Sequence, residues 1–339
     1  MSIQGLHHIT LVCSDARRTV DFYTRVLGLR LIKKTVNFDD PGSYHLYFGD
    51  HVGSPGTAIT FFEWRDAPRG HPGVGGTHHF ALQVADYAGL LKWKRRLTDL
   101  GLQVEVPIDQ RYFNAIQFRD PDGAFIQIAT RGPGWTRDEQ TLVADQARLQ
   151  SETWDAPVDD ITPEMSLHGG MHHITAISSN LERTEAFYSD LLGMPRVKAV
   201  TDLDDVRAAH WYWGAGDGRP GTLVSYIQRD PREVSRARYG VGQTHHFALA
   251  VPDAETQLAW REKIVRAGLR VSPVMDRVYF KSIYTNDPDG HIVELATLGP
   301  GFAVDEEVEH LGGCLKLPPW LEKYRDEIEP TLQPIPALG

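Results

Sequence analysis

The sequence predicts an α+β protein that contains four copies of a βαβββ unit, and three observations support this prediction. A His–His pair begins an apolar stretch four times, at residues 7–8, 78–79, 172–173 and 245–246. A shift of 165 residues aligns "GLHHITLVCSDARRTVDFYTRVLGL" with "GMHHITAISSNLERTEAFYSDLLGM". A shift of 167 residues aligns the segment from Thr77 to Trp135 with its second copy without a gap. The chain is therefore a duplicated half, and each half holds two units.

The first unit shows the order of elements. "HHITLV" is short, apolar and rich in β-branched residues, which predicts a strand. Residues 15–28 predict a helix, because apolar residues recur near helical spacing between Asp15, a suitable N-cap, and Gly28, a suitable C-cap. Three strand-like stretches follow, "LRLIKKTVNF", "YHLYFG" and "GTAITFFEW", separated by Gly, Pro and Asp turns.

The fourth unit repeats this order in "HHFALAV", the helix "AETQLAWREKIVRAG", and the strands "LRVSPVMDR", "YFKSIYTN" and "IVELAT". We predict two domains, over residues 1–135 and 169–302, joined by a polar linker over 136–168. Residues 303–339 form a tail in which "PPWLEKYRDEIEP" predicts a short helix that begins at its two prolines.

The composition restricts the class of protein. No stretch of 18 apolar residues and no basic, apolar leader is present, so the sequence predicts neither a membrane span nor a signal peptide. Cys13 and Cys314 are too few for a disulfide framework, which predicts a reducing, cytoplasmic location. The net charge of −10, without a Lys/Arg-rich run, argues against nucleic acid and membranes as partners.

A carboxylate in the last strand predicts a metal. Glu294 lies in the apolar stretch "IVELAT", and strand alternation puts it opposite Val293 and Leu295. An unpaired charge there would be costly, so we expect a metal or a cationic partner. Alternation also turns His246 away from the apolar face, and two histidines with one carboxylate are the ligand set of non-haem Fe(II) oxygenases. For His7, His78 or His172 taken alone, a structural role is the simpler interpretation.

The two halves differ at three matched positions. Gln127, Gln110 and Gln117 of the first half stand where the second half has an acid, a cation and a phenol, namely Glu294, Arg277 and Tyr284. An amide oxygen does not supply the negative charge that a divalent transition metal favours beside two imidazoles. We therefore predict one working metal site, with "THHFALAV", and a second cup, with "THHFALQV", that does not hold the metal. The alternative explanation for the three glutamines is sequence drift at surface positions.

Five motifs carry a resemblance to a known family: "LHHITL", "YHLYFGDHVGSPGT", "THHFALAV", "VYFKSIY" and "IVELATLGPGF". Over about residues 5–302 the chain resembles the vicinal oxygen chelate superfamily. It is most similar to the ring-cleaving dioxygenases of para-hydroquinones, including the 2,6-dichlorohydroquinone 1,2-dioxygenases. The resemblance implies two pseudo-symmetric domains, each a curved mixed sheet that closes a cup. It also implies Fe(II), or Mn(II), and insertion of O2 next to a ring hydroxyl of a hydroquinone-type aromatic.

The resemblance leaves the third metal ligand open between His8 and His173, which lie in identical "HHIT" strands. Catechol-cleaving relatives pair units three and four, which would select His173, whereas hydroquinone-cleaving relatives pair units one and four, which would select His8. The "YHLYFGDHVGSPGT" motif favours the second pairing. We therefore predict His8, His246 and Glu294 as the metal ligands.

The resemblance also places five residues around the metal: His7, Thr10, His245, Arg277 and Tyr284. His245 and Tyr284 are candidates for proton transfer. Arg277 could stabilise anionic charge or orient Tyr284, and an ion pair with a nearby acid is the alternative. The expected partners are a small aromatic substrate, O2 and a second copy of the chain in a homo-oligomer. A glyoxalase-like metal-dependent isomerase or lyase and a catechol extradiol dioxygenase are the alternative functions.

Overall fold

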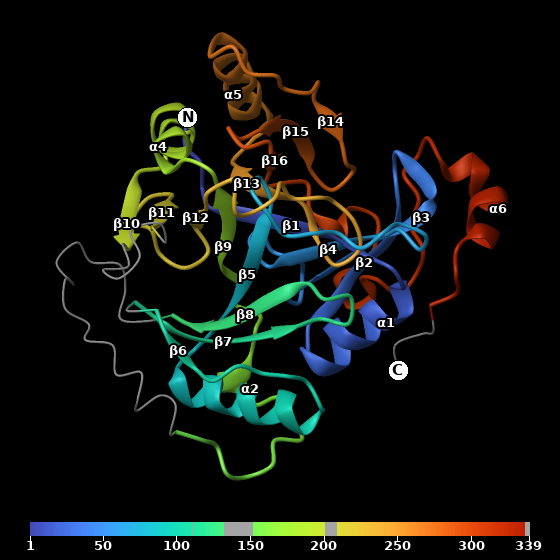
Figure 1. Ribbon diagram of the computed structural model, residues 1–339. Coiled ribbons are helices and arrows are strands. Elements are labelled where there is room, and N and C mark those ends of the chain that lie inside the picture. Colours follow the sequence, from blue (N-terminus) through green and yellow to red (C-terminus); the bar gives the residue numbers. More distant parts are fainter. Residues whose placement is uncertain (111, 132–151, 201–208, 336–339) are drawn as a thin grey trace.

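The computed structural model describes residues 1–110, 112–131, 152–200 and 209–335, and it contains the four predicted units (Figure 1). In unit one the elements are β1 (Leu6–Cys13), α1 (Ala16–Asp21), the π-helical η1 (Phe22–Val26), β2 (Arg30–Asn37), β3 (Asp40–Gly49) and β4 (Ala58–Glu63). Unit two has β5 (Thr77–Val84), α2 (Tyr87–Asp99), β6 (Ile108–Asp109), β7 (Asn114–Arg119) and β8 (Phe125–Thr130).

The second half repeats these elements. Unit three has β9 (Met171–Ser178), α4 (Leu181–Glu185), the π-helical η3 (Ala186–Leu191), β10 (Arg196–Val200), β11 (His210–Gly214) and β12 (Leu223–Gln228). Unit four has β13 (Thr244–Val251), α5 (Ala254–Arg266), β14 (Met275–Asp276), β15 (Lys281–Asn286) and β16 (Ile292–Thr297).

Short helices form the remaining elements. The linker region contains the 3-10 helix η2 (Pro163–Met165), and the tail contains η5 (Phe302–Val304), η6 (Val308–His310), η7 (Glu322–Tyr324), α6 (Arg325–Ile328) and η8 (Glu329–Thr331). The predicted helix in the tail is thus three consecutive short turns.

Local sequence explains the ends of the first helical segment and one of two departures from the prediction. The Asp15 carboxylate accepts a hydrogen bond from the Arg18 N–H, and Gly28 has a φ of 71°, so the predicted N-cap and C-cap residues end the helical segment. Its second part, however, is π-helical. In unit four the strand predicted in "LRVSPVMDR" shrinks to β14, because Pro273 has no N–H to donate to a ladder.

The strands form two eight-stranded sheets, and each sheet takes one unit from each half. The first has the order β14-β15-β16-β13-β1-β4-β3-β2 and combines units four and one. The second has the order β10-β11-β12-β9-β5-β8-β7-β6 and combines units three and two. The antiparallel pairs β1–β13 and β5–β9 lie at the centres of the sheets. The boundaries 1–135 and 169–302 therefore describe the duplication, and as domain limits they stay predictions. Residues 132–151, which span the end of the first predicted domain and the first part of the predicted linker, lie outside the described residues.

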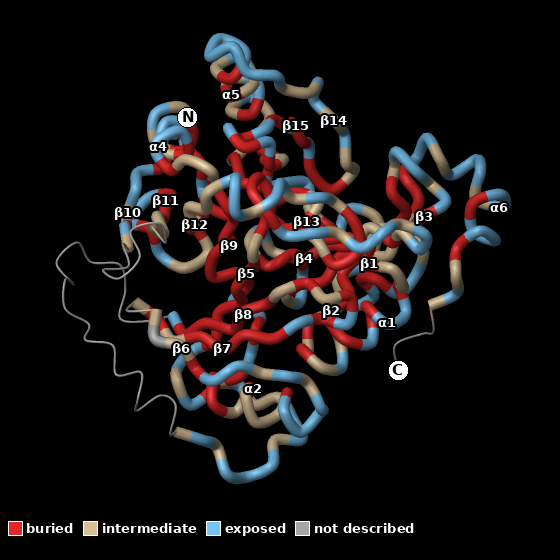
Figure 2. The backbone as a smooth tube through the Cα atoms, viewed as in Figure 1, coloured by how far each residue is buried: buried red, intermediate tan, exposed pale blue. Residues whose placement is uncertain are grey.

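Two equivalent contacts join the sheets. The buried Asp122 carboxylate accepts hydrogen bonds from the Ser14 N–H and Oγ, at 2.9 and 2.7 Å. The matching Asp289 accepts from the Ser179 N–H and Oγ, at 2.8 and 2.5 Å. Figure 2 shows that buried residues follow the strands, whereas exposed residues lie on the outer sides of α2, α5 and α6. Within the described residues, no helix has the length and apolar character needed to cross a membrane.

The tail packs against β2 and against the loop between β14 and β15 of the first sheet. The fully buried Lys33 of β2 pairs with Asp305, at 2.5 Å, and with Glu306. Tyr279 also donates a hydrogen bond to Asp305, at 3.1 Å, and Phe302 packs against the Tyr279 ring. The tail therefore supports the loop that connects β14 to β15.

Candidate metal centre and its cavity

Three adjacent strands bring the predicted ligands together. His8 lies on β1, His246 on β13 and Glu294 on β16, and β13 pairs with both other strands. One ligand atom from each residue lies within 4.8 Å of the other two, and all three residues are buried. The Nε2 atoms of His8 and His246 lie 3.3 and 2.9 Å from Oε2 of Glu294. The structure thus unites units one and four at this cluster.

The surroundings of the Glu294 carboxylate favour a bound metal, because only one of its two oxygens accepts a hydrogen bond. Its Oε1 accepts a 2.5 Å hydrogen bond from the Ser282 hydroxyl, but Oε2 accepts none of good geometry despite the two nearby imidazoles. Burial opposes ionisation, yet His8 and His246 hold the pKa of this carboxyl well below its usual range. An anionic oxygen that faces two imidazole nitrogens without an aligned N–H matches a metal site with open positions.

Strand bulges explain why both members of each His–His pair reach the cluster. In the β1–β13 ladder, Leu6 faces Leu249 and His8 faces Ala248, so His7 is an extra residue on β1. On β13, His246 faces Thr10 and Thr244 faces Leu11, which makes His245 the extra residue. The bulges override simple alternation, which places consecutive side chains on opposite faces.

The extra histidines orient the ligand histidines. Nδ1 of His7 lies 2.9 Å from Nδ1 of His8, and Nδ1 of His245 lies 2.8 Å from Nδ1 of His246. Burial lowers the pKa of both His7 and His245 to about 3, so both are neutral at pH 7. A neutral partner on Nδ1 fixes the ring and leaves Nε2 of each ligand histidine directed into the cluster.

The other predicted residues also lie at the cluster. The Thr10 hydroxyl is 3.1 Å from Nε2 of His246. Arg277 donates from Nε to the Tyr284 hydroxyl, at 3.2 Å, and forms an ion pair with Asp39, also at 3.2 Å. The structure therefore contains a contact for each interpretation of Arg277, the orientation of Tyr284 and the ion pair with a nearby acid. Burial, with Glu294 nearby, raises the pKa of Tyr284, which keeps it protonated.

A small cavity of about 200 Å³ opens beside the ligands. Its walls are mostly aromatic rings and imidazoles, with Arg277 and Asp39 as charged groups; the lining residues are His8, Asn37, Phe38, Asp39, His45, Tyr47, Phe62, Trp64, His245, His246, Arg277, Phe280 and Tyr284. Apolar walls with a few polar groups are typical of a site for a small aromatic molecule.

Five residues at the site were not predicted from the sequence. Four of them line the cavity, namely His45, Tyr47, Phe62 and Trp64, and the fifth is the buried Ser282 that contacts Glu294. Ser282 could have been found by comparing the halves, because Ala115 stands at the matched position. His45, Tyr47 and Phe62 come from β3 and β4 of unit one, Trp64 directly follows β4, and none of them gives a ligand-like pattern in the sequence.

The second sheet repeats the imidazole geometry without the carboxylate. The ring centroids of His79 and His173 are 5.4 Å apart at 85°, against 5.5 Å at 85° for His8 and His246. The two Nε2 atoms lie 3.3 Å apart, and Oε1 of the buried Gln127 has no hydrogen-bond partner. This cup therefore keeps the frame and lacks the negative ligand.

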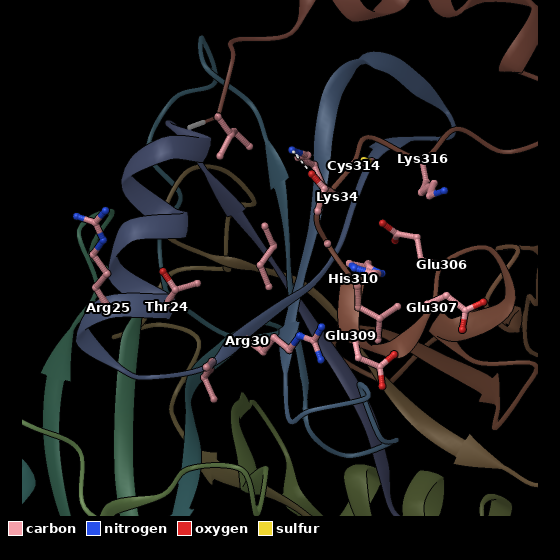
Figure 3. Close-up of a pocket in the computed structure, with 16 residues that line it drawn as sticks. Thr24, Arg25, Arg30, Lys34, Glu306, Glu307, Glu309, His310, Cys314 and Lys316 are labelled. Atoms are coloured by element: carbon pink, nitrogen blue, oxygen red, sulfur yellow. Dashed lines mark hydrogen bonds between the residues drawn. The ribbon is translucent and has the colours of Figure 1, made fainter. Parts of the chain in front are cut away.

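A larger cavity of about 940 Å³ lies between β2 and the tail (Figure 3). Its labelled side chains include Arg30, Lys34, Glu306, Glu309 and Cys314. Charged groups of both signs surround it, and the cluster of three metal-type ligands found among the described residues lies elsewhere. We therefore place the functional site at the smaller cavity.

Comparison with known proteins places the chain among characterised relatives. Residues 5–128 and 170–295 match the family model of the Glyoxalase/Bleomycin resistance protein/Dioxygenase superfamily. The chain is 34% identical over 333 residues to MhqO of Bacillus subtilis, named as a candidate ring-cleaving dioxygenase, which covers 97% of this chain and 96% of the relative. It is 33% identical over 342 residues to chlorohydroquinone/hydroquinone 1,2-dioxygenase of Sphingobium indicum, which covers 97% and 96%.

Solved structures share the fold. A crystal structure of a candidate dioxygenase from Bacillus subtilis matches with a TM-score of 0.83 and 32% identity, covering 99% of this chain and 98% of that one. Glyoxalase I from Zea mays matches with a TM-score of 0.61 at 18% identity, covering 86% and 92%, and shows a common fold alone. The predicted fold is confirmed, and the named relatives support an oxygenase enzyme, as the sequence predicted.

Proposed function

Since the chain belongs to the glyoxalase/bleomycin resistance protein/dioxygenase superfamily, we propose that it is a metal-dependent ring-cleaving dioxygenase of hydroquinone-type aromatics. Its metal is Fe(II), with Mn(II) as the alternative, held by His8, His246 and Glu294. The observation that carries the proposal is the meeting of His8 from unit one with His246 and Glu294 from unit four. This is the pairing expected of hydroquinone-cleaving relatives and not of catechol-cleaving ones.

Two imidazoles and one carboxylate suit Fe(II) and leave positions for a ring hydroxyl and for O2. When bound, the metal would lower the pKa of a ring hydroxyl and would provide the path for electron transfer from the ring to O2. The cavity, of about 200 Å³, has room for a substituted aromatic ring.

The protein's own residues position the substrate and its protons. Phe62, Trp64 and Phe280 give the ring apolar walls, which exclude water. Arg277 donates a hydrogen bond to the Tyr284 hydroxyl and places a positive charge in the cavity wall, beside the ring that becomes anionic. His245, neutral and open to the cavity, can accept a proton from the substrate or return one.

The test is anaerobic purification, reconstitution with Fe(II), Mn(II) or Zn(II), and measurement of oxygen uptake. We expect uptake with hydroquinone and methylhydroquinone, dependent on Fe(II) or Mn(II), and much less uptake with catechol. A preference for catechol would replace the hydroquinone assignment with extradiol cleavage. Absence of uptake together with isomerase activity in the Zn(II) form would replace the dioxygenase proposal. A homo-oligomer and a cytoplasmic location stay predictions.

A further inference from the structure

The polar groups of the cavity lie at two different ends of it. The proposed metal ligands come from β1, β13 and β16, near the middle of the sheet, and their side chains are at most 5% exposed. Asn37, in contrast, ends the edge strand β2, which β4 and β3 separate from β1, and Asp39 follows it. The Asp39 side chain is 65% exposed, so this turn lies where the cavity meets solvent. A molecule that reaches the ligands with one end therefore points its other end toward Asn37 and Asp39.

The turn that contains Asn37 is held in place by three contacts. The Asp39 N–H donates a 3.1 Å hydrogen bond to Oδ1 of Asn37, as in the local turns that asparagine favours. The Asp39 carboxylate forms its 3.2 Å ion pair with Arg277 across the cavity. The Phe38 ring packs against Trp320 of the tail, with the ring centroids 5.6 Å apart. The Asn37 side chain is therefore positioned before any ligand enters.

The side-chain amide of Asn37 has a donor group that these contacts do not use. Arg277 and Asp39 pair with each other, whereas Asn37 uses only its Oδ1, as an acceptor. The other end of the amide is therefore the NH2 group, which can donate two hydrogen bonds. Among the described residues this NH2 group has no hydrogen-bond partner, although Asn37 is only 9% exposed and lines the cavity. An oxygen atom of a molecule in the cavity would satisfy it.

We propose that Asn37 is a specificity-determining residue that donates a hydrogen bond from its NH2 group to the second hydroxyl oxygen of the substrate. The inference rests on the proposed function, because it assumes a hydroquinone-type ring bound at the ligand cluster by one hydroxyl. The second hydroxyl of such a ring lies para to the first and points directly away from it, toward β2.

The position of Asn37 then accounts for the choice between ring types. In catechol the second hydroxyl lies next to the first, so the far end of the ring presents no oxygen to the Asn37 NH2 group. A phenol with a single hydroxyl leaves the same group without a partner. Asn37 therefore favours hydroquinones over both classes, and it does so at the end of the cavity opposite the ligand cluster.

The test separates this hydrogen bond from the shape of the cavity. Hydroquinone and 4-methylphenol have nearly the same size, but 4-methylphenol has no oxygen at its far end. Each is titrated into the Fe(II)-loaded protein in the absence of oxygen, where neither is cleaved, and its dissociation constant is measured by calorimetry.

Two variants are compared with the wild type. Asn37→Ser is the main variant, because a serine hydroxyl can replace Oδ1 in the turn but is too short to replace the NH2 group. Asp40→Asn is the control, since the exposed Asp40 faces Asn37 across the β2–β3 ladder and is not among the residues that line this cavity.

We expect the wild type to bind hydroquinone more tightly than 4-methylphenol. Asn37→Ser should weaken hydroquinone binding about three- to tenfold, as for one hydrogen bond between neutral groups, and should change 4-methylphenol binding less than about twofold. In oxygen uptake the KM for hydroquinone should rise by a similar factor while kcat changes less than about twofold, because the hydrogen bond forms equally in the bound substrate and in the transition state. Asp40→Asn should match the wild type throughout.

Three results would overturn the inference and leave the proposed function intact. They are oxygen uptake by a wild type that does not prefer hydroquinone to 4-methylphenol, an unchanged preference in Asn37→Ser, and an equal loss for both ligands. A wild type that takes up no oxygen with hydroquinone would overturn the proposed function, and with it the substrate on which the inference rests. The melting temperature of each variant is recorded. If Asn37→Ser does not fold, Asn37→Thr also keeps a turn-forming hydroxyl and must show the same selective loss for hydroquinone.

Discussion

Glu294→Gln tests the metal centre, because it copies Gln127 of the first half into the second. The two side chains have nearly the same volume, and the Ser282 hydroxyl, 2.5 Å from Oε1, can donate to an amide oxygen as it does to the carboxylate. Volume-conserving substitutions in a core usually cost less than about 1.5 kcal/mol. We therefore expect the free energy of unfolding of the metal-free protein to fall by less than about 1.5 kcal/mol.

The effect on the metal should be much larger. The substitution removes the negative charge of the ligand set and leaves two neutral imidazoles with an amide oxygen. Loss of an outer partner of a ligand alone typically costs about 10–100-fold in metal affinity. Loss of a ligand's charge should cost at least about 100-fold, or about 2.7 kcal/mol, and oxygen uptake should fall with iron occupancy.

Fe(II) affinity would be measured by anaerobic competition with a chelator, and stability by urea unfolding of the metal-free protein. Gln127→Glu is the matched control and should leave turnover unchanged. It can create a second, weaker site, since His79 and His173 already converge, but Ala115 stands where Ser282 anchors the carboxylate. If Glu294→Gln keeps full iron occupancy and wild-type ring cleavage, Glu294 is not a ligand and the assignment is wrong.

Four further predictions follow from the contacts. The chain should bind close to one Fe(II) or Mn(II) tightly, as measured by metal analysis; two ions at matched affinity would contradict the role given to the second cup. His8→Ala should abolish metal-dependent turnover, whereas His173→Ala should mostly spare it, and the reverse result would assign the site to units three and four. Lys33→Met should lower the free energy of unfolding by about 3 kcal/mol, because it leaves two acids of the tail without their buried partner; a change below about 1 kcal/mol would refute this. Burial lowers the pKa of His291 to about 3, against about 6.5 when unfolded, so its contribution to stability is complete above pH 6.5 and is lost as the pH falls. His291→Leu should therefore reduce the loss of stability between pH 7 and pH 5 by about 2 kcal/mol in urea unfolding, and an unchanged pH dependence would contradict the shift.

The repeats and the local patterns predicted the fold well, because they depend on short-range chemistry. Asp15 and Gly28 ended a helical segment where the sequence placed them, and the four units were found from their His–His strands. The π-helical turn Phe22–Val26 was not predicted, since its apolar spacing differs little from that of an α-helix.

The pairing of units could not be derived from the sequence, because it depends on which strands meet at the centre of a sheet. His8 and His173 both lie in the tetrapeptide HHIT, so the residues next to them do not show which one is the ligand. The structure distinguishes them through the β1–β13 pair, which joins the first unit to the last across more than 230 residues of chain. The resemblance to a family, and not the residues alone, made the prediction of His8 specific.

The paired histidines show where alternation fails as a guide to a site. Alternation requires two consecutive side chains of a strand to face opposite sides, so it allows one histidine of each pair at the cluster. A bulge adds one residue to one strand, and both rings then turn to the same region, with their Nδ1 atoms 2.8–2.9 Å apart. The second cup keeps the same bulges and the same Nδ1 contacts at His78–His79 and His172–His173, although it lacks the carboxylate. The bulges therefore belong to the duplicated fold. Glu294, held by Ser282 where the other frame has Gln127 and Ala115, is what distinguishes the proposed metal centre from the second cup.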